Sequence, residues 1–178
     1  MPMSREDKLQ ILIDHAEISD LLIRSCHAID RLDRPLLESL YWPDAVDNHG
    51  HYNGSATGFI DWVFEHLTPM KTQHFIGNAW IQLDSPTTAQ GQTYVIALHQ
   101  AKTPFGGEDM TVGARYLDRF EKRGDEWRLK ERTVVVDYSQ IAASDLHRYD
   151  SFPNSGAHGP NDPFYRVLSM SGDARQSS

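Results

Sequence analysis

The hydrophobic pattern of this chain changes once, near residue 70, from the period of a helix to the period of a strand. Before that point apolar side chains recur every three or four residues, as at Ile18, Leu22 and Ile29, which places them on one face of a helix. After it, apolar and polar residues alternate, the pattern of strands with one buried face. Three helices followed by a run of long antiparallel strands favour an α+β fold, with the helices on one face of a curved sheet.

Start and stop residues place three helices in the first part of the chain. Ser4, followed by acidic residues, fits the capping pattern that begins a helix. Asp33, which precedes an Arg-Pro pair, caps a second one. Trp42-Pro43-Asp44 is expected to break that second helix. The expected elements are a long amphipathic helix over about 5–31, a short helix ending near Tyr41, short strands at 45–48 and 50–52, and a third helix over about 58–67.

The second part of the chain predicts four long strands and then an irregular tail. Gly124 supplies the backbone angles of a short hairpin turn between the last two strands. After about Ser144 the chain is rich in Ser, Gly, Pro, Asn and His, which indicates irregular structure. We therefore expect one domain over 1–144 and a tail over 145–178 with a disordered end, which some apolar residues could dock on the body or on a neighbouring chain. The strands are expected at Gln73–Leu83, Ala89–Ala101, Thr111–Arg123 and Glu126–Ser139, and the docking residues are Phe152, Phe164, Tyr165 and Val167.

Composition narrows the class of protein. The 178 residues suit one domain, and the net charge of −8 disfavours a nucleic-acid partner, which needs a basic surface. No apolar run approaches the ~20 residues of a membrane span. The N-terminal residues show no apolar signal region and Cys26 is the single cysteine. We therefore expect a cytoplasmic protein without a membrane partner.

Metal, nucleophile and cofactor motifs are weak in this sequence. His49-Gly50-His51 suggests a metal site, but alternate strand residues point to opposite faces, and no HExxH or cysteine cluster accompanies it. We expect a polar turn there and no metal. Cys26 neighbours His27 on a helix, where adjacent residues do not face each other, so a buried, inert thiol is expected. No phosphate loop or dinucleotide fingerprint is present, and no cofactor is expected.

Asp30 and His74 are the main candidates for chemistry. Asp30 ends the first helix and has two interpretations: a solvated carboxylate paired with Arg31 or Arg34, or a side chain that leans toward the sheet. His74 lies near the start of an otherwise apolar strand. It has three interpretations: a core histidine, a metal ligand, or a base aimed into a cavity. If the two meet, the carboxylate holds one ring nitrogen and makes the other a better base.

Two further residues have open interpretations. His99 shares a strand face with Thr93, Val95 and Ala97, and is either an exposed strand-end residue or a pocket residue. Arg132 is either an anion anchor in a pocket or the salt-bridge partner of an acid. Its strand face also carries Val134, Val136 and Tyr138.

Several motifs, taken together, resemble the SnoaL-like branch of the nuclear transport factor 2-like superfamily. They are the helix end "AID", then "YWPDAV", "TQHFIGN" and "RYLDRFEKRGDEWRLKERTVV" with an Asp-Tyr after it, which cover about residues 5–140 in order. The resemblance implies a cone-shaped barrel in which a curved antiparallel sheet is wrapped by the three helices around a deep apolar pocket. It also implies a homodimer or homotrimer, and Phe75 facing away from the pocket, against helices or a neighbouring subunit.

The resemblance implies roles for particular residues, since the branch includes cofactor-free lyases with an Asp–His dyad. The dyad falls on Asp30 and His74, a second pocket histidine on His99, and a pocket arginine on Arg132. The groups that protonate the leaving group in these lyases are not retained in this sequence: Ser25 stands where relatives have Tyr or Lys. His49 stands in place of a tyrosine and Thr72 in place of a cysteine. His49 or His99 could protonate a leaving oxygen instead, with Tyr41 as a third candidate. The expected pocket walls are Tyr41, Trp42, Trp80 and Tyr138.

These residues lead to a functional hypothesis with two alternatives. The lead is a cofactor-independent lyase whose His74 removes a proton from a small hydrophobic aromatic or polycyclic compound, such as a lignin-derived diarylpropane, with loss of water, halide or formaldehyde. One alternative is an isomerase that moves a proton within the ring compound. The other is a non-catalytic binding or assembly module in which Asp30 and His74 form a structural hydrogen bond.

Overall fold

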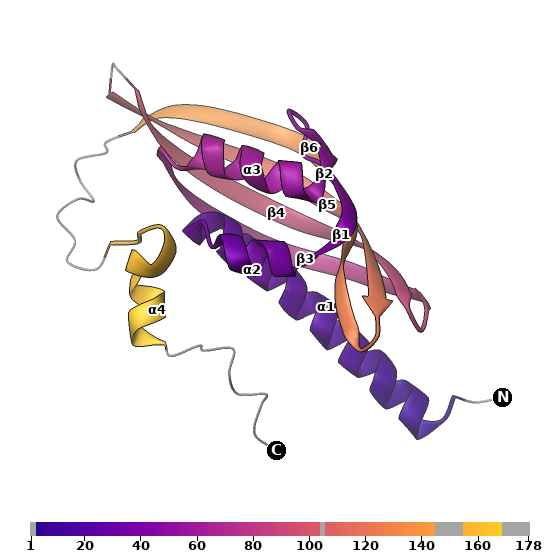
Figure 1. Cartoon of the computed structure of the whole chain (residues 1–178). Coiled ribbons are helices and arrows are strands. Elements are labelled where there is room, and N and C mark those ends of the chain that lie inside the picture. Colours follow the sequence, from indigo (N-terminus) through magenta and orange to yellow (C-terminus); the bar gives the residue numbers. More distant parts are fainter. Residues whose placement is uncertain (1–2, 104–105, 145–154, 169–178) are drawn as a thin grey trace.

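The computed structural model describes residues 3–103, 106–144 and 155–168 and contains a curved six-stranded sheet with helices packed on its inner face (Figure 1). Its helices are α1 (Arg5–Arg31), α2 (Arg34–Ser39), α3 (Ala56–Leu67) and α4 (Pro163–Val167), with a 3-10 turn at Gly159–Asn161. Its strands are β1 (Tyr41–Asn48), β2 (Asn53–Ser55), β3 (Met70–Ser85), β4 (Thr88–Thr103), β5 (Gly106–Arg123) and β6 (Glu126–Ser144). The α+β class and the three covering helices are confirmed. Across the described ranges, no helix is both long and apolar enough to span a membrane.

Helix caps form where the sequence predicts them. The Ser4 side chain accepts a hydrogen bond from the Asp7 amide, and the Asp7 side chain accepts one in return, so a complete capping box begins α1. Asp33 accepts from the Leu36 amide and caps α2. Between the two helices Leu32 takes a left-handed conformation, φ 50°, that ends α1 sharply. These caps fix the turn that carries Asp30 to the edge of the sheet.

The connection after α2 differs from the prediction. Strand β1 already begins at Tyr41, so Trp42-Pro43-Asp44 lies inside a strand instead of breaking a helix. The pairing of β1 with β6 is parallel, and its register shifts between Tyr41 and Val46. A proline has no amide hydrogen for the ladder, so it is tolerated where the pairing is irregular. Strand β2 lies at Asn53–Ser55, later than the predicted 50–52, because Gly50 makes a turn with φ 76°.

The strand order is β2-β1-β6-β5-β4-β3, and every other neighbouring pair is antiparallel. The register aligns His74 with Ala97 and Ala97 with Val112 on the inner face, and Thr72 with His99 one row nearer the end of the sheet. The buried core lies between this face and the helices. Its completely buried apolar side chains include Ile18, Leu22, Leu37, Phe59, Val63, Phe120 and Leu129.

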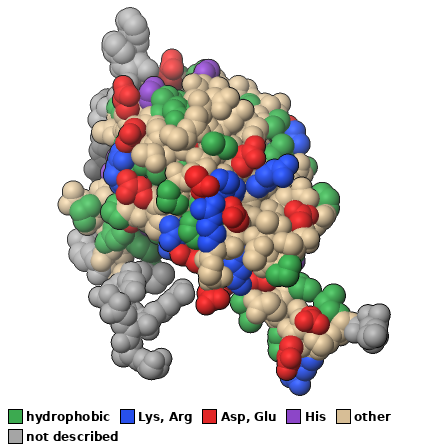
Figure 2. Space-filling view, turned by 45° about the vertical axis from the view of Figure 1, so that its right-hand side comes forward, with side chains coloured by type: hydrophobic (Ala, Val, Ile, Leu, Met, Phe, Trp, Pro, Cys, Tyr) green, Lys and Arg blue, Asp and Glu red, His purple; other side chains and the backbone are tan. Residues whose placement is uncertain are grey.

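The outer face of the sheet and the start of α1 are exposed. Phe75 is 67% exposed, so the expectation that helices cover it is wrong, and contact with a neighbouring chain stays a prediction. Figure 2 shows acidic and basic side chains interspersed on the face in view, and the N-terminal end of α1 projecting from the body. Of the predicted docking residues, Phe164 and Tyr165 contact α1, Val167 is exposed, and Phe152 lies outside the described residues.

Candidate functional site

The end of α1 brings Asp30 into contact with His74 on β3. The Asp30 carboxylate accepts hydrogen bonds from His74 Nδ1 at 2.7 Å, from the His74 backbone amide at 2.8 Å and from Thr72 Oγ1 at 2.9 Å. Asp30 is buried, and the His74 side chain is almost completely so. Of the two interpretations of Asp30, the structure has the one in which it leans toward the sheet. Arg34 pairs with Glu38 and Asp61 instead.

The charge state of the pair follows from these contacts. Burial alone would raise the pKa of Asp30, but hydrogen bonds and charge from His74, with the Thr72 hydroxyl, bring that pKa below its ordinary value. Asp30 is therefore ionised near neutral pH, and an ionised carboxylate can only accept. Nδ1 of His74 must carry the proton, which leaves Nε2 as the basic nitrogen. Within the described ranges no protein group is hydrogen-bonded to Nε2.

A cavity of about 720 Å³, within the size range of small-molecule sites, is lined by Asp30 of this pair, whereas His74 is not among its lining residues. Asp30, Thr72 and His99 form part of its lining. The other lining residues are Arg31, Lys71, Gln73, Leu98, Gln100, Asp109, Met110, Thr111 and Ser155–His158.

His99 lies in the cavity wall near His74, with the ring centroids 5.7 Å apart and the planes nearly perpendicular. Its Nδ1 atom is buried without a hydrogen-bond partner among the described residues. Burial first, and then the nearby His74, lower the pKa of His99 to about 4. His99 is therefore a pocket residue that stays neutral at physiological pH, which makes it a poor proton donor to a leaving group.

Arg132 is the salt-bridge partner of an acid, which is one of the two interpretations that the sequence left open. Its Nε and Nη2 each donate to Asp118 at 2.8 Å, and its guanidinium lies 4.1 Å from the centre of the Tyr116 ring. Burial alone would lower the pKa of Arg132, but the charge and hydrogen bonds of Asp118 raise it well above its ordinary value. The side chain is completely buried and is not among the residues that line the cavity.

Tyr41 and His49 meet at a separate buried carboxylate. The Tyr41 hydroxyl donates to Asp47 at 2.8 Å, and His49 Nδ1 lies 3.1 Å from the other Asp47 oxygen. The His49 ring stacks on Phe59 in the core. Neither Tyr41 nor His49 is among the residues that line the cavity, and Asp47 is the polar partner of both.

Three aromatic residues that were predicted as pocket walls, Trp42, Trp80 and Tyr138, do not line the cavity. The guanidinium groups of Arg123 and Arg128 each lie over the Trp42 ring, and the indole N–H donates to the Glu121 carbonyl, near the β5–β6 hairpin. Trp80 is 70% exposed on the outer face.

The physical reason for the Trp80 error is an extra residue in β3. Ile76 pairs with Val95 and Ala79 with Thr93, so three steps on β3 face two on β4, and the alternation after this bulge is reversed. Trp80 therefore points away from the face that holds His74.

A second bulge displaces Tyr138. Ala114 pairs with Val136 but Gly113 pairs with Tyr138, which leaves one extra residue on β6. Val112 and Ala114 pack in the interior, so position 113 faces outward, and the Tyr138 ring covers this glycine. Tyr138 is 56% exposed and is not a cavity wall.

Some site residues were not predicted from the sequence. Thr72 was noted only as a departure, yet its hydroxyl holds Asp30. Arg31 was considered only as a surface partner of Asp30, but it lines the cavity and binds the C-terminal segment. Ser155–His158 also line the cavity. A long-range contact of this kind leaves no periodic signal in a sequence.

Comparison with known proteins gives the family. Residues 10–133 match the model of the SnoaL-like domain, and the chain belongs to that family. Gamma-hexachlorocyclohexane dehydrochlorinase of Sphingobium indicum is 26% identical over 135 residues, which are 73% of this chain and 85% of the relative.

Solved structures agree on the fold. A type 2 hexachlorocyclohexane dehydrochlorinase superposes with a TM-score of 0.70 at 23% identity, covering 77% of this chain and 94% of the other. A scytalone dehydratase-like protein from Novosphingobium aromaticivorans gives 0.68 at 18% identity, covering 79% and 98%. The fold is thus the cone-shaped fold of the nuclear transport factor 2-like superfamily. The family and these distant relatives support a lyase- or isomerase-type function on a small molecule.

Proposed function

We propose that this protein is a cofactor-independent lyase for a small hydrophobic, ring-bearing compound, with His74 as general base and Asp30 as the residue that orients it. The observation that carries the proposal is the 2.7 Å contact of His74 Nδ1 with Asp30, a residue that lines a cavity large enough for a small molecule. A histidine whose ring is oriented by a carboxylate is suited to removing a proton from carbon.

The proposed step is an elimination. Nε2 of His74 takes a proton from a carbon next to the carbon that bears the leaving group. The electron pair of that C–H bond forms the new double bond, and the leaving group departs with its own bonding pair. His74 becomes an imidazolium, which the Asp30 carboxylate stabilises through Nδ1, and it returns the proton to water or to the departed group.

The surroundings of the dyad favour a leaving group that needs no proton. His99 is neutral because its pKa lies at about 4, and His49 and Tyr41 are committed to Asp47 away from the cavity. A halide departs readily as an anion, whereas hydroxide is a poor leaving group unless an acid protonates it. Elimination of hydrogen halide is therefore supported better than loss of water, and the 26% identity to a dehydrochlorinase agrees with it. Loss of formaldehyde from a diarylpropane is the next outcome to test.

Mass spectrometry of product mixtures tests the proposal. Metal-free protein is incubated with gamma-hexachlorocyclohexane, hydroxylated polycyclic compounds and lignin-type diarylpropanes, beside His74→Ala and a control variant, His51→Ala, which changes an exposed histidine. Loss of hydrogen chloride, water or formaldehyde in wild type and His51→Ala, but not in His74→Ala, is the expected result and identifies the bond broken. Undiminished turnover by a folded His74→Ala variant would rule out the dyad as base.

Two other functions give different results in the same assay. An isomerase leaves the substrate mass unchanged while the retention time of the product changes. A non-catalytic binding module leaves every compound unconverted and binds a member of the panel without any dependence on the titration of His74.

A further inference from the structure

The cavity has one wall that comes from the far end of the described chain. Ser155–His158 line it together with Asp30 and His99. The 3-10 turn and α4 follow directly, and this segment, residues 155–168, lies beside the C-terminal end of α1 (Figure 1). This wall therefore comes from a segment separate from the strands that carry His74 and His99.

Asp162 is the main anchor of this segment. It is buried, and its carboxylate accepts from Arg31 Nη1 at 3.1 Å, from the Ala157 amide at 2.8 Å and from the Phe164 amide at 2.9 Å. Burial alone would raise the pKa of Asp162, but the two amides and Arg31 bring that pKa below its ordinary value. One carboxylate thus folds the segment around itself and ties it to α1.

Two aromatic residues add further anchors on the same helix end. The Tyr165 hydroxyl donates to Asp33, the cap of α2, and lies 3.4 Å from His27 Nε2. The Phe164 ring is tilted against the His27 ring, with centroids 4.3 Å apart. The segment therefore has polar and aromatic contacts on both sides of Asp162.

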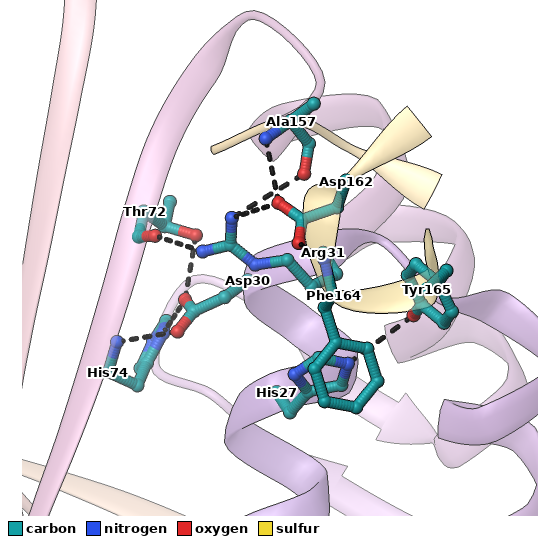
Figure 3. Close-up of polar contacts among 9 residues, drawn as sticks. All are labelled: His27, Asp30, Arg31, Thr72, His74, Ala157, Asp162, Phe164 and Tyr165. Atoms are coloured by element: carbon teal, nitrogen blue, oxygen red, sulfur yellow. Dashed lines mark hydrogen bonds and ion pairs between the residues drawn. The ribbon is translucent and has the colours of Figure 1, made fainter. Parts of the chain in front are cut away.

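Arg31 links this segment to the dyad. Figure 3 shows its guanidinium between Asp162 and Thr72: Nη1 donates to Asp162, and Nη2 donates to the Thr72 carbonyl at 3.3 Å. The Thr72 hydroxyl in turn donates to Asp30. At Gly156 an added Cβ would lie 2.9 Å from Arg31 Nη1, so the absence of a side chain there permits the close approach.

We propose that residues 155–168 form a substrate-selective wall of the cavity and that Arg31 is a positioning residue, which couples the docking of this wall to the geometry of Asp30 and His74. The inference rests on the proposed function, because it assigns both roles to the same site. Ser155, Gly156 and Ala157 are small, so this wall leaves room for a two-ring compound. A larger side chain at Ala157 narrows the cavity without touching the dyad.

The test compares variants that undock the wall with a matched control. Asp162→Ala removes the anchor, and Asp61→Ala removes the exposed partner of Arg34 instead. Arg31→Gln and Arg31→Lys form a second pair. Lysine restores the positive charge beside Asp162, but its single ammonium group lacks the two separate guanidinium nitrogens that bond Asp162 and Thr72. Amide hydrogen exchange at Ala157 measures the docking of residues 155–168. The NMR titration of the His74 ring measures the coupling of that docking to the dyad. KM and kcat, for the panel compound that the wild type converts, measure the contribution of the segment to substrate binding.

For Asp162→Ala and Arg31→Gln we expect at least tenfold faster amide exchange at Ala157, a shifted His74 titration and a roughly tenfold higher KM. Arg31→Lys should recover part of each effect, and Asp61→Ala should match the wild type. Undocking that leaves the His74 titration unaltered would overturn the positioning role of Arg31. Undocking that leaves KM unaltered would overturn the wall. If Asp162→Ala does not fold, the two Arg31 variants give the same test.

Selectivity is measured separately with Ala157→Phe. This variant is expected to lose two-ring compounds while it keeps single-ring ones, and equal loss of both would contradict a selective wall. If the wild type converts no compound, the proposed function fails by itself. The wall is then tested by the binding of the fluorescent probe 1-anilinonaphthalene-8-sulfonate. Its affinity should fall in Asp162→Ala and stay unchanged in Asp61→Ala. Equal affinity for the two variants would contradict the wall.

Discussion

Asp118→Asn is predicted to cost this protein a large part of its stability, because Asp118 is the buried counter-charge of Arg132. The two side chains are 1% and 0% exposed and are joined by two hydrogen bonds of 2.8 Å between β5 and β6. An asparagine keeps the shape but leaves a buried guanidinium without a counter-charge. Breaking a buried pair from one side costs about 3–5 kcal/mol, out of a total stability of roughly 5–15 kcal/mol.

The structure offers a matched control between the same two strands. Arg115 and Asp137 also form a two-pronged pair, with bonds of 2.8 and 2.9 Å, but their side chains are partly exposed. Exposed pairs of this kind contribute about 0.2–1 kcal/mol. Asp137→Asn makes the same chemical change with the burial removed.

Urea unfolding followed by tryptophan fluorescence measures both variants. With a slope of about 2 kcal/mol per M, Asp118→Asn is expected to lower the midpoint by about 1.5–2.5 M. For Asp137→Asn the expected shift is about 0.1–0.5 M. The double variant Asp118→Leu with Arg132→Met should recover most of the loss, since neither position then leaves a buried charge without its partner. Equal midpoints for the two single variants would refute the reasoning and would mean that water reaches Arg132.

Three further predictions concern the site and the surface. Asp30→Asn places an amide where three donors converge, so His74 loses its orientation, and turnover should fall about 10³–10⁴-fold in initial-rate assays; a loss below tenfold would contradict the orienting role. Because the pKa of His99 is lowered to about 4 in the folded protein, the unfolded chain binds its proton first, and stability should fall as pH drops from about 6.5 to about 4. Urea unfolding at pH 7 and pH 4.5 measures how much unfolding free energy is lost on acidification, and His99→Asn should lose less than wild type, by at most about 3 kcal/mol. An identical loss in both proteins would contradict the lowered pKa of His99. The exposed outer face, with Phe75 and Trp80, is expected to form a homodimer or homotrimer contact, so light scattering of Trp80→Ser should show a smaller particle than wild type; a monomeric wild type would refute this.

Much of the fold and part of the site follow from the sequence alone, because they depend on local chemistry. The change from period 3.6 to period 2 gave the α+β class, and the capping residues Ser4 and Asp33 gave the starts of two helices. Cys26 was expected to be an inert thiol, and it is buried, with a pKa raised to about 11 by that burial. The position of Asp30 at a helix end and of His74 at a strand start made the pair a candidate. Each of these signals lies within a few neighbouring residues.

Only the tertiary structure decided which partner each polar group meets. Arg132 had two interpretations until β5 brought Asp118 beside it, and Asp30 had two until β3 brought His74. Trp80 and Tyr138 were assigned to the wrong face because one extra residue in each strand reverses every later side chain, and a bulge is set by the pairing with the next strand. The wall of residues 155–158 was not predictable because its anchor, the contact of Asp162 with Arg31, joins residues 131 positions apart in the sequence. Backbone preference and hydrophobic period act over neighbouring residues, whereas a buried charge is satisfied by whichever group the completed fold places next to it.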